Sequence, residues 1–499
     1  MPDVIPGVGQ YYSNNTDGRV VIVQSLNNST VQWRYARSYG DGRLSTGVVH
    51  STSADSFVSS FTSLVTALPN LSGFGWDYTA HPINIYQSSP GRYRTDLDPR
   101  SKVNAAIWSG PTYYVDGSRP NNSGDGLSEA TAVQSIAVAL NKLNTNASAT
   151  GGRIMIKNSA GGYDRTRDTN DTANTNTLNN IVPSKPVAFI GYGGKPLVGP
   201  FANLTYTQDG LSYIAPRSAV NRVLFLDDKG KYSIEAVQRA SVADVNAYGG
   251  WIQDGANVRI RHPQGDVISN ANAKVFVGAP GFTVGGNNVD VYIENVEYIG
   301  GSGGCVTSLA ASTRNLVFVD VEGHHPGGVG ALARNVFPVD NQTGFLGFWR
   351  CVAYGGSADG FNIHGVSGQV YVLLVDCVGF DNGRTGSTSN QGLTVHEGCI
   401  VFDLNGRYFG NAGGNVRNID TSQMASFGTS CNDDRGDTIF GGLVSPVDFK
   451  FDNTAKFWGV DILAKNSNSS LDLSSGAVVN LRRALLPNGI TGVGTVNYF

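Results

Sequence analysis

The sequence predicts an all-β solenoid, a parallel β-helix in which successive coils of one chain stack along an axis. Three observations predict this fold. Five segments of the chain align with one another at a nearly constant spacing. Charged residues make up 15% of the chain, against roughly 25% in an ordinary soluble domain. Glycine occurs 64 times, which suits strands and tight turns better than long surface helices.

The internal repeat is the strongest of these observations. The aligned segments begin at residues 295, 320, 350, 376 and 405 and read NVEYIGGSGG, DVEGHHPGG, RCVAYGGSADGFNIH, DCVGFDNG and NGRYFGNAGG. Their starts lie 25 to 30 residues apart, which is the length of one coil with short strands and variable loops. The repeat therefore predicts stacked coils rather than a β-meander.

Stacking predicts two side-chain ladders, because rungs about 4.8 Å apart place aligned residues directly over one another. One aligned position should form a mostly aromatic ladder of Ile299, His324, Tyr354, Phe380 and Phe409. Another should form a polar ladder of Asn295, Asp320, Arg350, Asp376 and Asn405. In the polar ladder Arg350 is expected to lie between two carboxylates.

The chain divides into two predicted units. Residues 1–108 differ in pattern from the rest and are interpreted as a small, separate N-terminal attachment domain. Residues 109–499 form the β-helix, with an excursion at about 203–280 that projects from its side. An amphipathic helix between Val133 and Leu143 is expected to cap the open N-terminal end of the core, whose strand edges would otherwise be unpaired.

The start of the second unit resembles a known superfamily. Tyr113-Tyr-Val, the Gly/Asn/Asp-rich loop and the helix are followed by strands at Gly152-Arg-Ile-Met-Ile-Lys and Pro186-Val-Ala-Phe-Ile-Gly. This order is similar to the first coils of the pectin-lyase-like superfamily. The resemblance implies a right-handed parallel β-helix that holds or cuts a polysaccharide along its side.

Within that superfamily the chain most resembles phage tailspikes and polysaccharide depolymerases, because it combines an N-terminal unit, a capped β-helix and no recognisable leader. The resemblance implies a homotrimer, a cell-surface polysaccharide as partner, and contacts with other tail or baseplate proteins through residues 1–108. It also implies a location on the virion, or outside the cell after release. A glycoside hydrolase and a polysaccharide lyase both remain open, and the alternative is a non-catalytic glycan-binding or structural spike.

Composition excludes other classes. The net charge is −3 with no Lys/Arg run, so binding to nucleic acid is not expected. No signal peptide and no apolar stretch of about 18 residues is seen, so membrane insertion is not expected either. Five cysteines without CxxC spacing indicate assembly in a reducing compartment. No cofactor or metal is predicted, although the CNDDRGD segment from Cys431 to Asp437 leaves calcium open.

The closest pair of repeats predicts a candidate site. Strand alternation turns Phe361 inward and places Asn362 and His364 on the outer face, and in the next coil it places Thr394 and His396 there. Two imidazoles should therefore lie one rung apart on one outer surface. Asn362 and Thr394 are the expected substrate-binding neighbours.

Carboxylates and a cation accompany these histidines. The alignment brings Asp359, Asp381 and Glu397 near them, and the inserted loop brings Arg384. Sugar chemistry needs an acid, a base and a cation for a uronate. We hypothesise that Asp359 and one of Asp381 or Glu397 act as acid and base, and that the histidines and Arg384 orient the sugar.

Competing interpretations remain open at this point. The outward histidines could form only a structural polar stack, or a metal site. His325 is expected to be exposed and is a weaker binding candidate than the histidine pair. Ser357-Ala-Asp-Gly-Phe-Asn resembles the polygalacturonase signature at Asp359 and Gly360, but Asn362 replaces its second aspartate and the other motifs of that family are not found. The inverting mechanism of that family is therefore not carried over.

Overall fold

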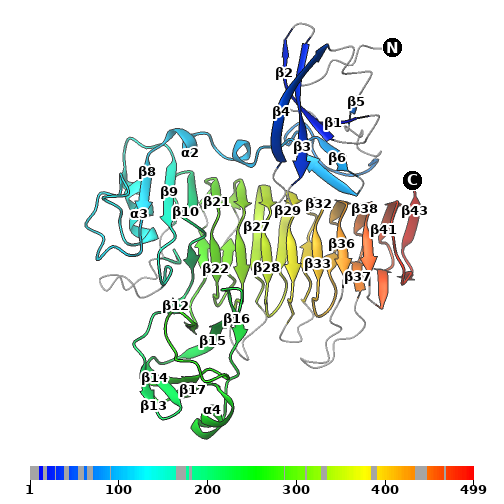
Figure 1. Cartoon of the computed structure of the whole chain (residues 1–499). Helices are drawn as coiled ribbons and strands as arrows, with labels where there is room; N and C mark the ends of the chain where they lie inside the picture. The colour runs from blue at the N-terminus through cyan, green and yellow to red at the C-terminus, as the bar shows by residue number, and fades with distance from the viewer. Residues whose placement is uncertain are drawn as a thin grey trace.

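The structure is a computed structural model of the 499-residue chain. It describes residues 11–14, 20–27, 30–38, 44–53, 61–63, 71–89, 91–164, 176–178, 182–285, 287–308, 312–327, 334–383, 390–432, 447–465 and 468–499. These residues form an all-β fold dominated by a parallel β-helix, as the repeat predicts. Figure 1 shows its coils stacked side by side, with an antiparallel N-terminal sheet on one side of the stack and a β excursion on the other.

The larger parallel sheet of the β-helix wraps around the stack. Its strands are β8 (Thr112–Val115), β9 (Gly152–Lys157), β10 (Val187–Tyr192), β20 (Phe282–Val284), β21 (Val291–Glu294), β23 (Val306–Ser308), β24 (Ser312–Thr313), β25 (Leu316–Val319), β27 (Phe337–Trp349), β29 (Phe361–Val375), β31 (Leu393–His396), β32 (Ile400–Leu404), β34 (Val416–Asn418), β35 (Gln423–Phe427), β37 (Val447–Phe451), β38 (Lys456–Val460), β40 (Ser469–Leu473), β41 (Val478–Arg482), β42 (Ile490–Gly492) and β43 (Thr495–Tyr498). The pairings within the coils are parallel, so each rung repeats the register of the one before.

A second, 8-stranded parallel sheet closes the other side of each coil. Its strands are β11 (Leu197–Val198), β22 (Glu297–Ile299), β26 (Glu322–His324), β28 (Val352–Tyr354), β30 (Val378–Phe380), β33 (Arg407–Phe409), β36 (Ser430–Asn432) and β39 (Leu463–Lys465). Aliphatic and aromatic side chains from both sheets fill one continuous core between them. All five cysteines are buried, and none of them forms a disulfide.

The predicted aromatic ladder is confirmed in the second sheet. The register aligns Ile299, His324, Tyr354, Phe380 and Phe409 on successive rungs. The rings of His324 and Tyr354 stack at 4.7 Å, those of Tyr354 and Phe380 at 4.8 Å, and those of Phe380 and Phe409 at 5.1 Å. The stacked rings hold neighbouring coils in a single register.

The polar ladder occupies the corner of each coil and differs from its expected pairing. Its five residues all have φ between 52° and 56°, the left-handed region that Asn and Asp tolerate best. Arg350 forms two hydrogen bonds with Asp320, of 2.7 and 2.8 Å. Asp376 instead accepts a 2.7 Å hydrogen bond from Arg94, which lies outside the coils. Arg350 thus hydrogen-bonds to only one of the two carboxylates expected.

The N-terminal region contains two structural parts. A 5-stranded antiparallel sheet, of order β4-β3-β2-β1-β5, comprises β1 (Tyr11–Asn14), β2 (Val20–Asn27), β3 (Thr30–Ser38), β4 (Leu44–Ser53) and β5 (Phe61–Ser63). The second part contains β6 (Ile85–Ser89), β7 (Arg92–Thr95), the 3-10 helix η1 (Pro99–Lys102) and α2 (Ala106–Ser109). This second part packs on the coils, and we call residues 71–89 and 91–109 the strap. The separate domain expected at residues 1–108 stays a prediction.

The strap is held by apolar and polar contacts. Trp76 and Tyr93 belong to one buried cluster with Phe402 and Phe427 on the outer side of the large sheet. The Tyr93 N–H donates to Asn405 Oδ1 at 2.8 Å, and Asn405 Nδ2 donates back to the Tyr93 carbonyl at 2.7 Å. The corner ladder therefore serves as the docking edge for the strap.

At the N-terminal end of the stack, α3 (Ile136–Thr145) packs on β8 and β9. Ile136, Leu140 and Leu143 of α3 are fully buried in the core of the coils. The helix begins after Ser135, and its buried residues recur at the spacing of one helical face. Among the described helices, none is long and apolar enough to cross a membrane.

The excursion leaves the coils after β11 and returns before β20. It consists of β12 (Phe201–Ala202), β13 (Thr207–Asp209), β14 (Ser212–Pro216), β15 (Val220–Leu226), β16 (Tyr232–Glu235), α4 (Val242–Tyr248), β17 (Gly250–Asp254), β18 (Asn257–Arg261) and β19 (Ala273–Val277). These strands form two 4-stranded antiparallel sheets with their own core around Trp251. Figure 1 shows the excursion projecting from the side of the stack.

Candidate functional site

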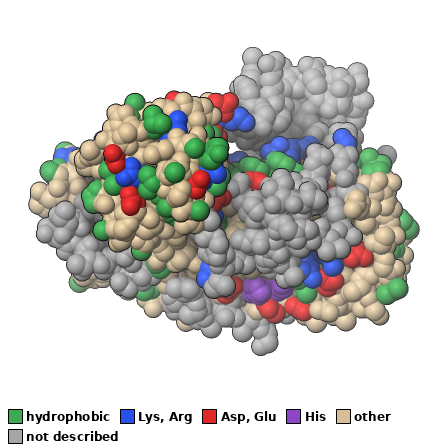
Figure 2. Space-filling model, turned by 90° about the horizontal axis from the view of Figure 1, so that it is seen from below, with side chains coloured by type: hydrophobic (Ala, Val, Ile, Leu, Met, Phe, Trp, Pro, Cys, Tyr) green, Lys and Arg blue, Asp and Glu red, His purple; other side chains and the backbone are tan. Residues whose placement is uncertain are grey.

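The candidate site lies on the outer face of the large sheet, where β29 and β31 pair in parallel. The register places His364 beside His396, and Ile363 beside Val395. Ile363 and Val395 are fully buried in the core, so alternation turns the two histidines outward, as the sequence predicts. Figure 2 shows histidine side chains on the surface seen from below, among acidic and basic ones.

The two imidazoles form a parallel stack. Their ring centroids lie 4.1 Å apart, and their planes differ by 5°. The His364 side chain is 28% exposed and the His396 side chain 17% exposed. Both rings can therefore be reached from solvent at their edges, while their faces cover each other.

Glu397 joins the pair by hydrogen bonding. Its carboxylate oxygens lie 2.9 and 2.8 Å from Nδ1 of His364, across the rung boundary. Glu397 follows β31 directly and has φ of 52°. This left-handed turn ends the strand and directs the Glu397 side chain back toward the previous rung. A carboxylate at Nδ1 fixes the orientation of an imidazole.

The second histidine has a different electrostatic environment. Nδ1 of His396 lies 4.0 Å from an Asp420 carboxylate oxygen. Burial lowers the pKa of His396 to about 4, with further lowering by His364 and Arg417 and partial compensation by Asp420. His396 is therefore a neutral imidazole at neutral pH.

Sequence reasoning missed two charged residues on this face. Asp340 follows Val339, which pairs with Ile363, so Asp340 lies on the rung before His364. Burial raises the pKa of Asp340, and the Glu397 charge raises it further, while His364 lowers it. The alignment of the coils places His364 beside His396, but it does not extend to Asp340. The pairing of β27 with β29 becomes irregular directly after Val339.

Arg417 is the second missed residue. It pairs in register with Thr394 on one side and Lys450 on the other, so three outward positions follow one another along the stack. Arg417 forms a 2.7 Å ion pair with Asp452. The cation expected here was Arg384, which lies outside the described residues. Among the residues that the structure does describe, Arg417 is a cation on the face that carries the histidines.

Asp359 lies beneath the outer face rather than on it, and its role as acid or base stays a prediction. The side chain is fully buried. One carboxylate oxygen accepts a 2.8 Å hydrogen bond from the Gln391 N–H. Burial raises the pKa of Asp359 to about 6, although the hydrogen bonds from Gln391 and Thr394 lower it. Asp359 thus joins two coils beneath the surface that carries the histidines.

The other candidates occupy varied positions. Asn362 and Thr394 point outward by register but are only 6% and 1% exposed, and Thr394 hydrogen-bonds to Gln391 Oε1 at 3.2 Å. Asp381 follows β30 in the second sheet, with φ of 54°. The roles of these three residues in binding or catalysis stay predictions.

The expected exposure of His325 is wrong, because its side chain is fully buried. Nδ1 of His325 lies 3.0 Å from Nδ1 of His324, whose Nε2 lies 3.1 Å from Glu297. Lys231 of the excursion forms ion pairs of 2.8 Å with Glu297 and 2.9 Å with Glu322. The second histidine pair therefore belongs to a buried network that joins the excursion to the coils.

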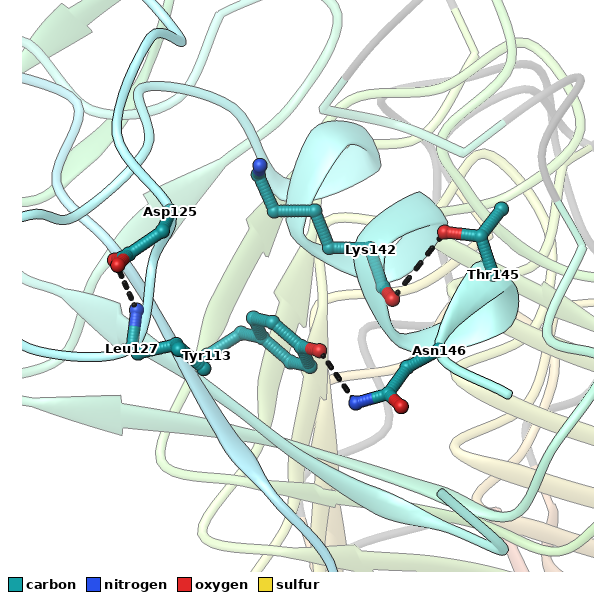
Figure 3. A pocket seen from close by; sticks show the side chains of 6 residues that line it. All are labelled: Tyr113, Asp125, Leu127, Lys142, Thr145 and Asn146. Atoms are coloured by element: carbon teal, nitrogen blue, oxygen red, sulfur yellow. Dashed lines mark hydrogen bonds between the residues drawn. The ribbon is translucent and has the colours of Figure 1, made fainter. Parts of the chain in front are cut away.

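A separate hollow of about 320 Å³ lies beside α3. Figure 3 shows its six lining side chains: Tyr113, Asp125, Leu127, Lys142, Thr145 and Asn146. Asn146 donates to the Tyr113 hydroxyl at 3.0 Å, and Asp125 accepts from the Leu127 N–H at 2.9 Å. None of these lining residues belongs to the histidine site, which lies several coils away.

Comparisons with known proteins give a likeness of fold at a low level. No family model matches the chain, and no curated protein matches it in sequence. A solved rhamnogalacturonan lyase is 11% identical with a TM-score of 0.34, covering 75% of this chain and 74% of its own. The tailspike protein gp49 from Pseudomonas phage LKA1 is 12% identical with a TM-score of 0.23, covering 77% and 81%. Neither likeness transfers a residue or an activity to this chain.

Proposed function

We propose that this chain binds and degrades a polysaccharide that lies across the rungs of its β-helix at His364, His396 and Glu397. The observation that carries the proposal is the His364–Glu397 hydrogen bond of 2.8 Å on a solvent-accessible outer face. A parallel β-helix repeats its outer surface every 4.8 Å or so, which suits a chain-like ligand. The same face carries Asp340 on one neighbouring rung and Arg417 on another.

The arrangement supports proton transfer. With the Glu397 carboxylate accepting from the Nδ1–H of His364, the Nε2 atom keeps its lone pair and can take a proton from water or from a sugar carbon. Asp340 lies on the preceding rung and is assigned as the acid for the leaving oxygen. Proton transfer of this kind contributes about 10²–10⁴-fold to a rate.

Neighbouring side chains would position the sugar. Neutral His396 stacks on His364 and limits rotation of that ring. Arg417, held by Asp452 at 2.7 Å, offers a guanidinium to a carboxylate or hydroxyl of the glycan. The same residues serve hydrolysis, in which His364 activates water, and elimination, in which it removes a proton beside a uronate carboxylate.

We also propose a biological setting for this activity. In it α3 caps the first coil, the N-terminal sheet attaches the protein to a virion, and three chains assemble so that their coils face one another. The packing of α3 on β8 and β9 supports the cap. Light scattering on the purified chain tests the trimer, since a monomeric mass would contradict it.

The test is a screen of the purified chain against capsules, O-antigens, alginate and pectin. Reducing ends and the ultraviolet absorbance of unsaturated uronates are followed together: both signals indicate a lyase, and reducing ends alone indicate a hydrolase. His364→Gln should lose the activity. His262→Gln is the matched control, because His262 also pairs with a carboxylate, Asp266 at 2.9 Å, but lies in the excursion.

Two results would contradict the proposal. One is full activity in a folded His364→Gln variant. The other is measurable glycan binding without any cleavage by the wild type, which would assign the chain as a non-catalytic adhesin.

A further inference from the structure

We propose that His364, His396 and Glu397 bind one Zn²⁺ ion, with a coordination position left open to solvent. Each residue offers one ligand atom, and these three atoms lie within 4.8 Å of one another. Two imidazoles and one carboxylate are a set of ligands that zinc takes in sites with an open fourth position. This inference goes beyond the proposed function and does not require a glycan. Zinc and the proton compete for Nδ1 of His364, so the metal-bound chain and the chain in which His364 acts as a base are separate states.

The distances fit a small ion. Zinc lies about 2.0–2.2 Å from imidazole nitrogen and carboxylate oxygen. Nδ1 of His364 and the Glu397 oxygen are 2.8 Å apart, so both can contact one ion that replaces the shared proton. The His396 ring lies 4.1 Å away with its plane parallel to that of His364, so the His396 side chain has to turn out of the stack for its nitrogen to reach the same ion.

The surroundings contain two carboxylates and one cation, Arg417, whose charge acts on His396 but which Asp452 holds in an ion pair of 2.7 Å. Asp420 lies 4.0 Å from His396 and is 38% exposed. Asp340 lies on the other side, on the rung before His364. Carboxylates beside ligating histidines orient the rings and increase their basicity, which strengthens metal binding. The exposure of Glu397, 45%, leaves a path for the ion from solvent.

The ligand types discriminate between metals. Calcium and magnesium prefer oxygen ligands, six or more of them for calcium. Imidazole nitrogen suits zinc and its transition-metal neighbours. The site is therefore assigned to zinc, and calcium serves as a negative control.

A second cluster shows why the assignment is specific to this face. Glu297, Glu322 and His324 also bring three ligand atoms within 4.8 Å. The Lys231 ammonium already lies 2.8 Å from Glu297 and 2.9 Å from Glu322, so a fixed cation of the chain itself occupies that cluster. Among the described residues, no lysine forms an ion pair with the His364 cluster, and His364 and Glu397 are 28% and 45% exposed to solvent.

The experiment is titration of the metal-free full chain with Zn²⁺ by calorimetry, in the absence of glycan. We expect one strong site per chain. His364→Gln and His396→Gln should each weaken binding at least about tenfold, since even the loss of an outer partner costs 10–100-fold. Asp420→Asn tests that outer partner. His262→Gln should bind as the wild type does, and Ca²⁺ should not compete.

Thermal unfolding of each variant, recorded with and without Zn²⁺, keeps the test independent of folding defects. A bound ion raises the melting temperature of the wild type and of His262→Gln, but not of the two site variants. Absorption of the Co²⁺-loaded chain gives a second readout of nitrogen coordination.

The inference is overturned if the wild type takes up no Zn²⁺, or if the two site variants bind it as tightly as the wild type. Zinc binding by a chain that cleaves no glycan would support this inference while contradicting the proposed function. Cleavage that continues at full rate in a chelator, with no zinc uptake by calorimetry, would contradict this inference while supporting the proposed function.

Discussion

His364 and His396 lie on adjacent rungs with their rings parallel within 5° and 4.1 Å apart. The relationship follows from the fold, because a parallel β-helix repeats each outward position one rung further on. The neighbours of these two rings are carboxylates: Glu397 binds His364 at 2.8 Å, and Asp420 lies 4.0 Å from His396. A repeated structural position thereby becomes a cluster able to move protons or hold an ion.

Glu397→Gln should remove most of the catalytic activity while leaving the fold intact. The amide keeps the shape of the side chain but no longer offers a negative charge to His364. We expect kcat on the glycan found in the screen to fall by roughly 10²–10⁴-fold, with an unchanged melting temperature because Glu397 is 45% exposed. A folded variant with wild-type kcat would remove Glu397 from the mechanism.

Asp359→Asn should behave differently from Glu397→Gln. Asp359 is fully buried and accepts a hydrogen bond from the Gln391 N–H, so we expect its carboxyl to act on the packing of the coils rather than on the glycan. We expect activity within a few-fold of the wild type, measured in the same assay. A loss as large as that of Glu397→Gln, without a change in melting temperature, would restore Asp359 as an acid or base.

Asp403→Asn should change how stability depends on pH. Burial raises the pKa of Asp403 to about 7, although hydrogen bonds from the Thr429 and Tyr408 hydroxyls lower it. In the unfolded chain the pKa is about 3.9, so the folded protein binds the extra proton. The free energy of unfolding of the wild type should therefore fall as the pH rises from about 4 through about 7.

The Asp403→Asn variant lacks this titration, so it should gain stability relative to the wild type over that range, by on the order of 1–3 kcal/mol. Urea unfolding at pH 5 and pH 8 measures the difference. If the difference in unfolding free energy between the variant and the wild type is the same at pH 5 and pH 8, Asp403 keeps its ordinary pKa in the folded chain.

Arg94 and Asp376 should be coupled energetically. Their 2.7 Å ion pair joins the strap to the corner ladder, and both side chains are mostly buried, 12% and 16% exposed. A double-mutant cycle with Arg94→Ala and Asp376→Asn should give a coupling of about 1–3 kcal/mol.

Arg350 and Asp320 provide the matched control. This pair has a similar distance, 2.7 Å, but side chains 40% and 36% exposed, so its coupling should be below about 1 kcal/mol. Equal coupling energies in the two pairs would mean that burial against the strap does not strengthen the Arg94–Asp376 ion pair.

Much of the fold could be predicted because the aligned segments repeat along the sequence. The 25 to 30 residue spacing locates the coils, and the ladder from Ile299 to Phe409 follows from it. The docking of Tyr93 on Asn405 could not be predicted, since the two residues lie 312 positions apart and no repeat connects them. For that reason the sequence does not separate the strap from the predicted attachment domain, whose bounds stay a prediction.

The outward position of the histidines in the candidate site could be predicted from the sequence in the same way. Alternation placed His364 and His396 outward, and proximity in sequence brought in Glu397. The burial of Asp359 and His325 could not be predicted, because the sequence around a polar turn residue does not indicate whether neighbouring coils cover it. Asp340 was missed because the pairing of β27 with β29 shifts register after Val339.

The most direct test of the central claim is a crystal structure of the Glu397→Gln variant with an oligosaccharide of the glycan that the wild type degrades. We expect the sugar to lie across the rungs of β29 and β31, with a sugar or water oxygen within hydrogen-bonding distance of Nε2 of His364. An oligosaccharide bound only elsewhere, such as in the hollow beside α3, with no contact to His364, would contradict the account.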